Sequence, residues 1–345
     1  MEKTSISSRG KKRLLLVILV GTILLAILFF LSLSLGNVRI PLGDVYDALG
    51  GLIHHGPESG YEKIIYNQRI PKVIATFAAG MGLAVAGVVF QAIIRNPLVD
   101  PYMTGVSSGA GFGATIVIIF GANLAMSAYM VPLAAFIGAL VAFAITFIMA
   151  TAAGGRAISY VLGGVMTAMA FGALTTMLMM INEKSAMSVL SFLFGSFSSI
   201  TWNNVWIMTI PIIILSIIIP MFSRSFNVAL LGEEQSKQLG LDYNKFKLFS
   251  MITASMLTAF CVAFVGIIGF VGLVVPHLCR MVLGGDHRLL FPASMIIGGV
   301  LMCTADIISR LVLASQALPV GAVMTLIGVP FFAFLLIKRG KEYAT

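Results

Sequence analysis

Long runs of apolar residues alternate with short polar segments along nearly the whole chain. About ten of these runs are long enough to cross a hydrocarbon layer of ~30 Å. Membrane-spanning strands would instead be short and would alternate apolar with polar positions, so the pattern predicts helices. The expected spans are roughly 14–35, 73–93, 104–121, 128–152, 158–181, 204–221, 247–267, 268–284, 291–312 and 319–337. The sequence therefore predicts an all-α polytopic membrane protein.

Composition supports this prediction. The 345 residues are 59% hydrophobic and 10% charged, with a mean hydropathy of +1.03, far outside what a water-soluble globule can present to solvent. The net charge of +9 would suggest nucleic acid as a partner of a soluble protein. Here the basic residues gather in alternate loops, so the positive-inside rule explains the charge and no nucleic-acid partner is expected. The same rule places both termini in the cytoplasm.

The chain is expected to form a single transmembrane domain over residues 1–345. The run after Lys11, Lys12 and Arg13 is too long for a signal peptide, so it is interpreted as a retained span behind a cytoplasmic tail, 1–13. The chain has three cysteines, Cys261, Cys279 and Cys303, and their spacing fits neither a metal site nor a disulfide pair. No metal site is therefore predicted.

Two of the segments between spans are expected to contain short helices, and one long apolar stretch is interrupted by glycines. Segment 36–70 begins with a short amphipathic pattern, and segment 182–203 resembles a short interfacial helix with Trp202 as its anchor. Both are expected on the outer face. The apolar stretch around Gly266 to Gly272 must be divided by its glycines into two crossings. Small residues crowd several spans, which favours close helix packing.

Residues 230–241 form a polar segment between two apolar runs. Gly232 can act as an N-cap, Glu233 and Glu234 place negative charge on the first helical turn, and Lys237 lies four residues after Glu233. Gly240 then supplies a stop. A loop could take such a turn with no further role. A capped helix with apolar leucines, among them Leu239, beside acidic side chains and the amide of Gln235 is also what docking to a soluble partner requires.

Four separated motifs resemble the FecCD family, the permease subunits of type II ABC importers for iron–siderophores, haem and cobalamin. The polar helix is similar to the family's coupling helix in GEEQSKQLGLD (232–242). The segment 69–114, RIPKVIATFAAGMGLAVAGVVFQAIIRNPLVDPYMTGVSSGAGFGA, resembles its first signature, with Gln91, Asn96, Pro97, Asp100 and Pro101. A second signature, in IGFVGLVVPHLCR from residue 268, contains Pro276 and His277, and 318–336 resembles the last span.

The resemblance implies a type II importer fold with ten spans per subunit and a homodimer in the cell membrane. Two cytoplasmic ATPase subunits and an extracytoplasmic binding protein are its implied partners. No GxxxxGK[ST] phosphate loop occurs in the chain, so the ATP chemistry and its Mg²⁺ are expected on a separate polypeptide. This chain is then expected to hold no cofactor and to be no enzyme.

The resemblance also assigns roles to residues. Glu233 and Glu234 would contact the ATPase, while Arg69, Lys72 and Arg310 would meet acidic residues of the binding protein. A few cations on a cation-poor surface can steer an acidic partner on physical grounds alone. For Lys72, snorkelling to the membrane interface is the favoured alternative.

The fifth span would line the translocation path. It carries Met166 and Met169, and its gate would fall near residues Ala157, Ile158 and Ser159. Methionine can equally fill gaps in a core.

Other polar residues have simpler interpretations. Asp306 lies one turn before Arg310, which predicts a structural ion pair in preference to a proton pathway. His277 is interpreted as a hydrogen-bonded packing residue, and His54 with His55 makes a poor chelator.

The leading hypothesis is an ABC importer permease for a chelated metal, with an iron–siderophore ahead of haem and cobalamin. An oxyanion is a further possible cargo. A different class, an ion-driven secondary transporter, would need several intramembrane carboxylates, and only Asp306 is available. A membrane-embedded enzyme is disfavoured because no pair of catalytic groups converges.

Overall fold

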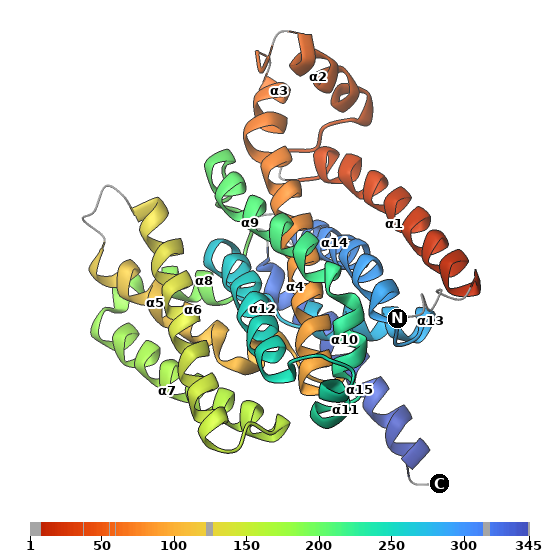
Figure 1. The fold of residues 1–345 in the computed structure, drawn as a ribbon. Coiled ribbons are helices and arrows are strands. Elements are labelled where there is room, and N and C mark those ends of the chain that lie inside the picture. The colour runs from red at the N-terminus through yellow and green to blue at the C-terminus, as the bar shows by residue number, and fades with distance from the viewer. Residues whose placement is uncertain are drawn as a thin grey trace.

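The computed structural model describes residues 8–36, 38–54, 56–58, 60–121, 127–312 and 318–343. Within these ranges the regular structure is entirely helical (Figure 1). In chain order the elements are α1 (Ser8–Ser34), α2 (Leu42–His54), α3 (Gly60–Ile64), π-helix η1 (Ile65–Arg69), α4 (Ile70–Ile94), 3₁₀-helix η2 (Pro101–Thr104), α5 (Val106–Phe120), α6 (Ser127–Ala152), α7 (Ala157–Ile181), α8 (Glu183–Leu193), α9 (Trp202–Met221), α10 (Ser223–Ala229), α11 (Glu233–Gln238), α12 (Tyr243–Val265), α13 (Val271–Leu283), α14 (His287–Leu311) and α15 (Val320–Tyr343).

Each predicted span overlaps one helix. Seven helices of the described chain are long and apolar enough to cross a membrane, and three shorter apolar helices complete the set: α5, α13 and α15. Helix α1 begins at Ser8, within the expected tail 1–13, and the polar segment 230–241 contains helix α11 at Glu233–Gln238. His55 lies outside the described residues.

Helix α4 forms the centre of the molecule. Nearly all of its side chains are buried, because α14, α12, α9 and α13 pack around it. Helices α5, α6 and α7 pack together beside α12, and α1 lies against α14 (Figure 1). The short helix α8 contacts α5 and α7.

Glycines set the closest helix approaches. A Cβ added to Gly87 of α4 would lie 1.9 Å from the carbonyl oxygen of Gly272 in α13. The same addition at Gly109 of α5 would lie 2.2 Å from the carbonyl oxygen of Gly138 in α6. Backbones this close leave no room for a methyl group, so the crowding of small residues reflects helix packing.

The apolar stretch 247–284 is broken where its glycines predicted a break. Helix α12 ends at Val265, Gly266 has a φ of +73°, and α13 starts only at Val271, so the crossing predicted from residue 268 is shorter than expected. Its 13 residues span about 20 Å. In the irregular segment between the helices Gly266 and Ile268 are buried, and the Tyr102 hydroxyl accepts a hydrogen bond of 3.3 Å from the Ile268 amide.

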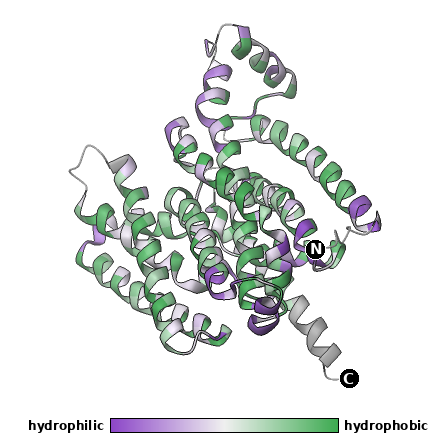
Figure 2. Cartoon of the chain, in the orientation of Figure 1, coloured by the Kyte–Doolittle hydropathy of each residue, from purple (hydrophilic) through white to green (hydrophobic). Residues whose placement is uncertain are grey.

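Polar elements stand at opposite ends of the helices. At one end, called here the α2 end, α2, α3 and η1 project beyond the other helices, while α10 and α11 form the other, the α11 end (Figure 1). Hydrophilic residues concentrate at both ends, and the helices between them are largely hydrophobic (Figure 2). The predicted interfacial anchor Trp202 donates its indole N–H to the Tyr66 carbonyl at 2.8 Å, at the α2 end.

Candidate functional site

The sequence of α11 determines both of its ends. Gly232 precedes the helix with φ +102° and ψ 173°, a conformation that glycine alone adopts readily. At the other end Gly240 has a φ of +83°, and the Leu241 amide donates to the Ser236 carbonyl at 3.0 Å, which is a Schellman stop. The predicted caps are therefore confirmed.

The charges of α11 satisfy one another. Lys237 Nζ lies 2.8 Å from Glu233 Oε1, as the spacing of four residues predicts. Hydrogen bonding and charge from Lys237 lower the pKa of Glu233, and Glu233 in turn raises the pKa of Lys237. The leucines around the helix remain exposed, with Leu239 at 54%. Gln235 and Glu234 are exposed as well, so α11 presents a folded but unpartnered surface.

Helix α10 connects α11 to the membrane helices, and the sequence reasoning missed it. The fully buried Ser236 of α11 donates to the Val228 carbonyl of α10 at 3.0 Å. Asn227 of α10 donates to Asp286 at 2.8 Å, and Asp286 also caps α14 by accepting from the Arg288 amide at 3.0 Å. These bonds connect α11 to α14 through α10.

The three predicted docking cations lie together at the α2 end, around Asp306. Lys72 Nζ is 3.2 Å from Asp306 Oδ1, and Arg310 pairs with the other carboxylate oxygen. The predicted pair of Asp306 with Arg310 is confirmed. Lys72 does not snorkel to the interface, because its side chain is only 13% exposed and binds Asp306.

Both arginines also bind the end of α1. Arg69 donates to the carbonyls of Leu33 and Val38, and Arg310 donates to the Ser32 hydroxyl at 2.5 Å. Cations at a helix C-terminus satisfy its free carbonyls and the negative end of its dipole. The Arg69 contacts span 36 and 31 positions of the chain, and the Arg310 contacts span 275 or more, so no local pattern in the sequence could have revealed them.

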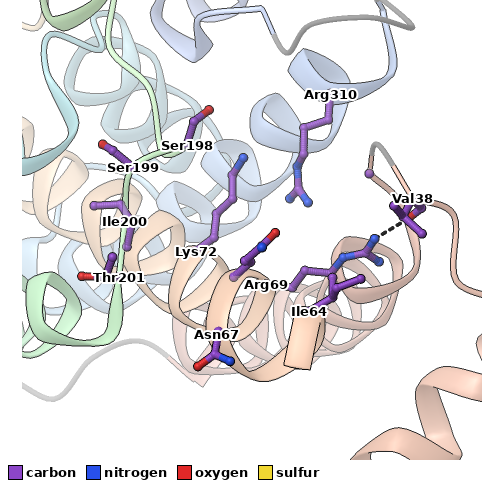
Figure 3. Close-up of a pocket in the computed structure, with 12 residues that line it drawn as sticks. Val38, Ile64, Asn67, Arg69, Lys72, Ser198, Ser199, Ile200, Thr201 and Arg310 are labelled. Atoms are coloured by element: carbon purple, nitrogen blue, oxygen red, sulfur yellow. Dashed lines mark hydrogen bonds between the residues drawn. The ribbon is translucent and has the colours of Figure 1, made fainter. Parts of the chain in front are cut away.

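The cations face a cavity of about 640 Å³, which also borders the segment before α9 (Figure 3). Figure 3 shows Lys72 and Arg310 beside one another, opposite the hydroxyl groups of the 198–201 segment. Arg69 is only 6% exposed, so an acidic partner would reach the cations through this cavity. The arrangement is suited to binding a carboxylate or another anion.

The first signature supplies a structural junction. The buried amide of Gln91 donates to the carbonyls of Val99, Gly272 and Leu273 at 3.3 to 3.4 Å, and its oxygen accepts from Arg280 at 3.0 Å. One side chain thus joins α4, the loop before η2 and α13.

The other residues of the first signature form the connection between α4 and η2. Asn96 accepts from the Leu98 amide at 3.0 Å, and Asp100 caps η2 by accepting from the Tyr102 amide at 2.8 Å. Pro101 packs against Gly272 of α13. Pro97 lies near buried His277 of α13, beside Pro276. These residues hold the packing of α4 and α13.

The predicted pathway residues lie on an exposed side of α7. Met166 is 62% and Met169 70% exposed. Ala157 and Ile158 begin the helix at the α11 end, and the Ser159 hydroxyl donates to the Ala153 carbonyl at 3.1 Å. In this single chain α7 therefore offers an apolar side to lipid or to another subunit.

Apolar helices of membrane length with polar elements at both ends define a multi-pass membrane protein, and the comparisons give its family. Residues 12–338 match the FecCD transport family. The chain belongs to this family and is a non-catalytic permease subunit of an ABC importer. A permease of this kind implies ATPase and binding-protein partners.

Similar proteins cover almost the whole chain. An ABC transporter permease protein of Methanocaldococcus jannaschii is 37% identical over 94% of this chain and 96% of its own. The Fe(3+)-citrate import system permease protein YfmE of Bacillus subtilis is 32% identical over 99% of this chain and 100% of its own. A solved structure of a metal-chelate type ABC transporter in an inward-facing conformation has a TM-score of 0.81 at 29% identity, covering 93% of this chain and 99% of that one. Further relatives are named for import of cobalamin, iron(3+)-hydroxamate and molybdate.

Proposed function

We propose that the chain is the permease of an importer for chelated iron, most specifically an iron–siderophore. Several similar permeases carry names for import of iron complexes, one with citrate and others with hydroxamates. Haem or cobalamin is the second candidate, favoured by the similarity to a cobalamin permease that is 36% identical. The ion-driven carrier considered from the sequence loses its support, since Asp306 is engaged by two cations.

The observation that carries the role of importer permease is α11 itself, a capped and exposed helix tied to α14 through α10. Glu233 and Glu234 would contact an ATPase subunit in the cytoplasm, together with Gly232, Gln235, Leu239 and Gly240. ATP and Mg²⁺ would bind to that subunit and not to this chain. Both chain termini would then lie in the cytoplasm, with the α2 end outside.

Two copies of the chain would place the exposed side of α7 along a shared path. Methionines on this side, among them Met166 and Met169, give a wall without charge, to which a cargo would bind weakly. The gate would lie where α7 begins, at Ala157 to Ser159. Acidic residues of the binding protein would enter the cavity at the α2 end and meet Arg69, Lys72 and Arg310.

Native mass spectrometry of the complex, extracted gently from its own membranes through a tag on this chain, tests the proposal. The expected mass corresponds to two 36.7 kDa chains with two copies of a soluble ATPase. A retained iron complex would identify the cargo, and retained cobalamin or haem would replace the iron assignment. A stable assembly without ATPase would contradict the proposed role of α11.

A further inference from the structure

A second polar cavity lies at the α11 end, between α11 and the hairpin that joins α6 to α7. It has a volume of about 180 Å³ and is lined by the C-terminal end of α4, the hairpin 154–157, the first turns of α7 and α12, and Glu233. A water molecule takes up about 30 Å³, so the cavity has room for a small polyatomic ion with its waters.

The walls of this cavity carry surplus positive charge. Arg95, Arg156 and Lys247 are in the lining, and the single acid among the lining residues is Glu233. Glu233 already binds Lys237 at 2.8 Å and Asn244 at 3.2 Å. Three cations therefore border one small space, and among its described lining residues the one acid, Glu233, is already paired.

Two of these cations, Arg95 and Lys247, contact neighbouring elements. Arg95 follows the last residue of α4 and has a φ of +55°. Its guanidinium lies close to Gly232, because a Cβ added to Gly232 would be 2.9 Å from Arg95 Nη1. Lys247 Nζ donates to the Gly155 carbonyl at 3.2 Å and lies 5.0 Å from the centre of the Tyr160 ring. The cavity is thus built from α4, α12 and the hairpin together.

Tyr160, the aromatic residue at the start of α7 that lines the cavity, carries an unsatisfied buried hydroxyl. Tyr160 is only 3% exposed, and its hydroxyl has no hydrogen-bond partner among the described residues. Arg156 is the N-cap of the 25-residue helix α7, and Ala157, the first residue of α7, also lines the cavity, so the positive end of α7 faces this region. A buried donor without a partner costs free energy, and a bound anion would satisfy it.

We propose that this cavity binds the phosphate group of an anionic ligand. Its oxygens would accept hydrogen bonds from Arg95, Arg156 and the Tyr160 hydroxyl, and guanidinium groups suit phosphate because they donate two parallel hydrogen bonds. The bound group would join the segment beside Gly232 to the start of α7. If the proposed function holds, phosphate then ties the ATPase contact to the gate and stabilises the conformation seen here.

Isothermal titration calorimetry with inorganic phosphate, on the purified full-length chain in a non-ionic detergent, tests the site. We expect one saturable site per chain, and about tenfold weaker binding in both Arg95→Gln and Arg156→Gln, since each loses a charge-assisted pair of hydrogen bonds. Tyr160→Phe keeps the ring and weakens binding by a smaller factor. Arg224→Gln, which removes an exposed cation of α10 outside the cavity, leaves binding unchanged.

A lipid headgroup would present the same phosphate chemistry. Native mass spectrometry after reconstitution with phosphatidylglycerol counts the lipids retained by each chain. Retention by the wild type and its loss in Arg95→Gln and Arg156→Gln would assign the site to a lipid; phosphate binding without lipid retention would assign it to a free ion.

Equal binding by wild type and variants in both assays would overturn the proposal. So would variants that weaken only the binding of the ATPase, because the cations would then serve a protein carboxylate. Both binding assays use the permease alone, so they can fail or succeed independently of transport.

Discussion

Acid–base clusters occur at both ends of the molecule, but their surroundings differ. At the α11 end the Glu233 and Lys237 side chains are 46% and 55% exposed. At the α2 end Asp306, Lys72 and Arg310 are 2%, 13% and 7% exposed. The first pair is solvated on the surface of one short helix, whereas the second group joins α1, α4 and α14.

This difference separates two uses of charge. A solvated pair contributes little to stability, so its members can exchange partners when another protein binds. Buried charges cannot lose a partner without a large penalty, so they fix the helices around the cavity. The α11 end is therefore suited to a changing contact, and the α2 end to a fixed anion-binding wall.

The largest expected effect is that of Asp306→Ala. Removing the shared carboxylate leaves Lys72 and Arg310 buried without their acid, which costs on the order of 3–5 kcal/mol of unfolding free energy. Thermal unfolding in detergent measures the loss, and adding Lys72→Met should restore part of it. Glu234→Ala, an exposed carboxylate, is the control. An unchanged unfolding temperature in Asp306→Ala would show that the cluster does not hold the helices.

Charge reversal at α11 should affect function and not folding. Glu233→Lys combined with Glu234→Lys is expected to abolish uptake of labelled cargo in proteoliposomes, while the unfolding temperature stays near that of the wild type. Glu183→Lys on α8 is a matched reversal of an exposed carboxylate and should transport normally. Normal uptake by the α11 variant would remove the evidence for coupling through this helix.

Two glycines that flank α11 offer a finer comparison. In Gly232→Ala the alanine must adopt backbone dihedral angles that cost it about 1–3 kcal/mol, and its methyl group would lie 2.9 Å from the Arg95 guanidinium. Gly240→Ala also strains the backbone but meets no atom within 4 Å. Uptake rates should fall further for Gly232→Ala. A larger fall in uptake rate for Gly240→Ala would show that the close approach of Arg95 to Gly232 does not matter for transport.

The smallest effect is a pH dependence of the link between α10 and α14. Partial burial raises the pKa of Asp286, but hydrogen bonds from Arg288 and Asn227 lower it more, to about 2 from an ordinary 3.8. A lowered carboxyl pKa stabilises the fold above 3.8, and this stabilisation disappears as the pH falls from 3.8 to about 2. The unfolding temperature of Asp286→Asn should vary less with pH in this window than that of the wild type. Identical profiles would contradict the lowered pKa.

Local patterns predicted much of this structure. Apolar runs identified the helices because burying the backbone in lipid leaves few alternatives. The glycines at 232 and 240 predicted both ends of α11, and the spacing of Asp306 and Arg310 predicted their pair, since each depends on residues within one or two helical turns.

Contacts between distant segments could not be predicted in this way. Lys72 meets Asp306 across α4 and α14, and Arg69 reaches the end of α1, because helix packing brings them together. The same holds for Arg95 beside Gly232. The π-helix before α4 was also missed. Pro71 lacks the N–H that would bond within a regular α-helix at this point, and no propensity pattern signals the looser turn.

Site-specific photo-cross-linking in intact cells tests most directly whether the two ends meet different partners. A photoreactive amino acid would replace Gln235 on α11 in one variant and Asn67 at the rim of the α2-end cavity in another. We predict that the Gln235 position captures the ATPase and the Asn67 position captures the substrate-binding protein. Capture of the ATPase from the Asn67 position, or of the binding protein from the Gln235 position, would contradict the proposed orientation and the separate roles of the two ends.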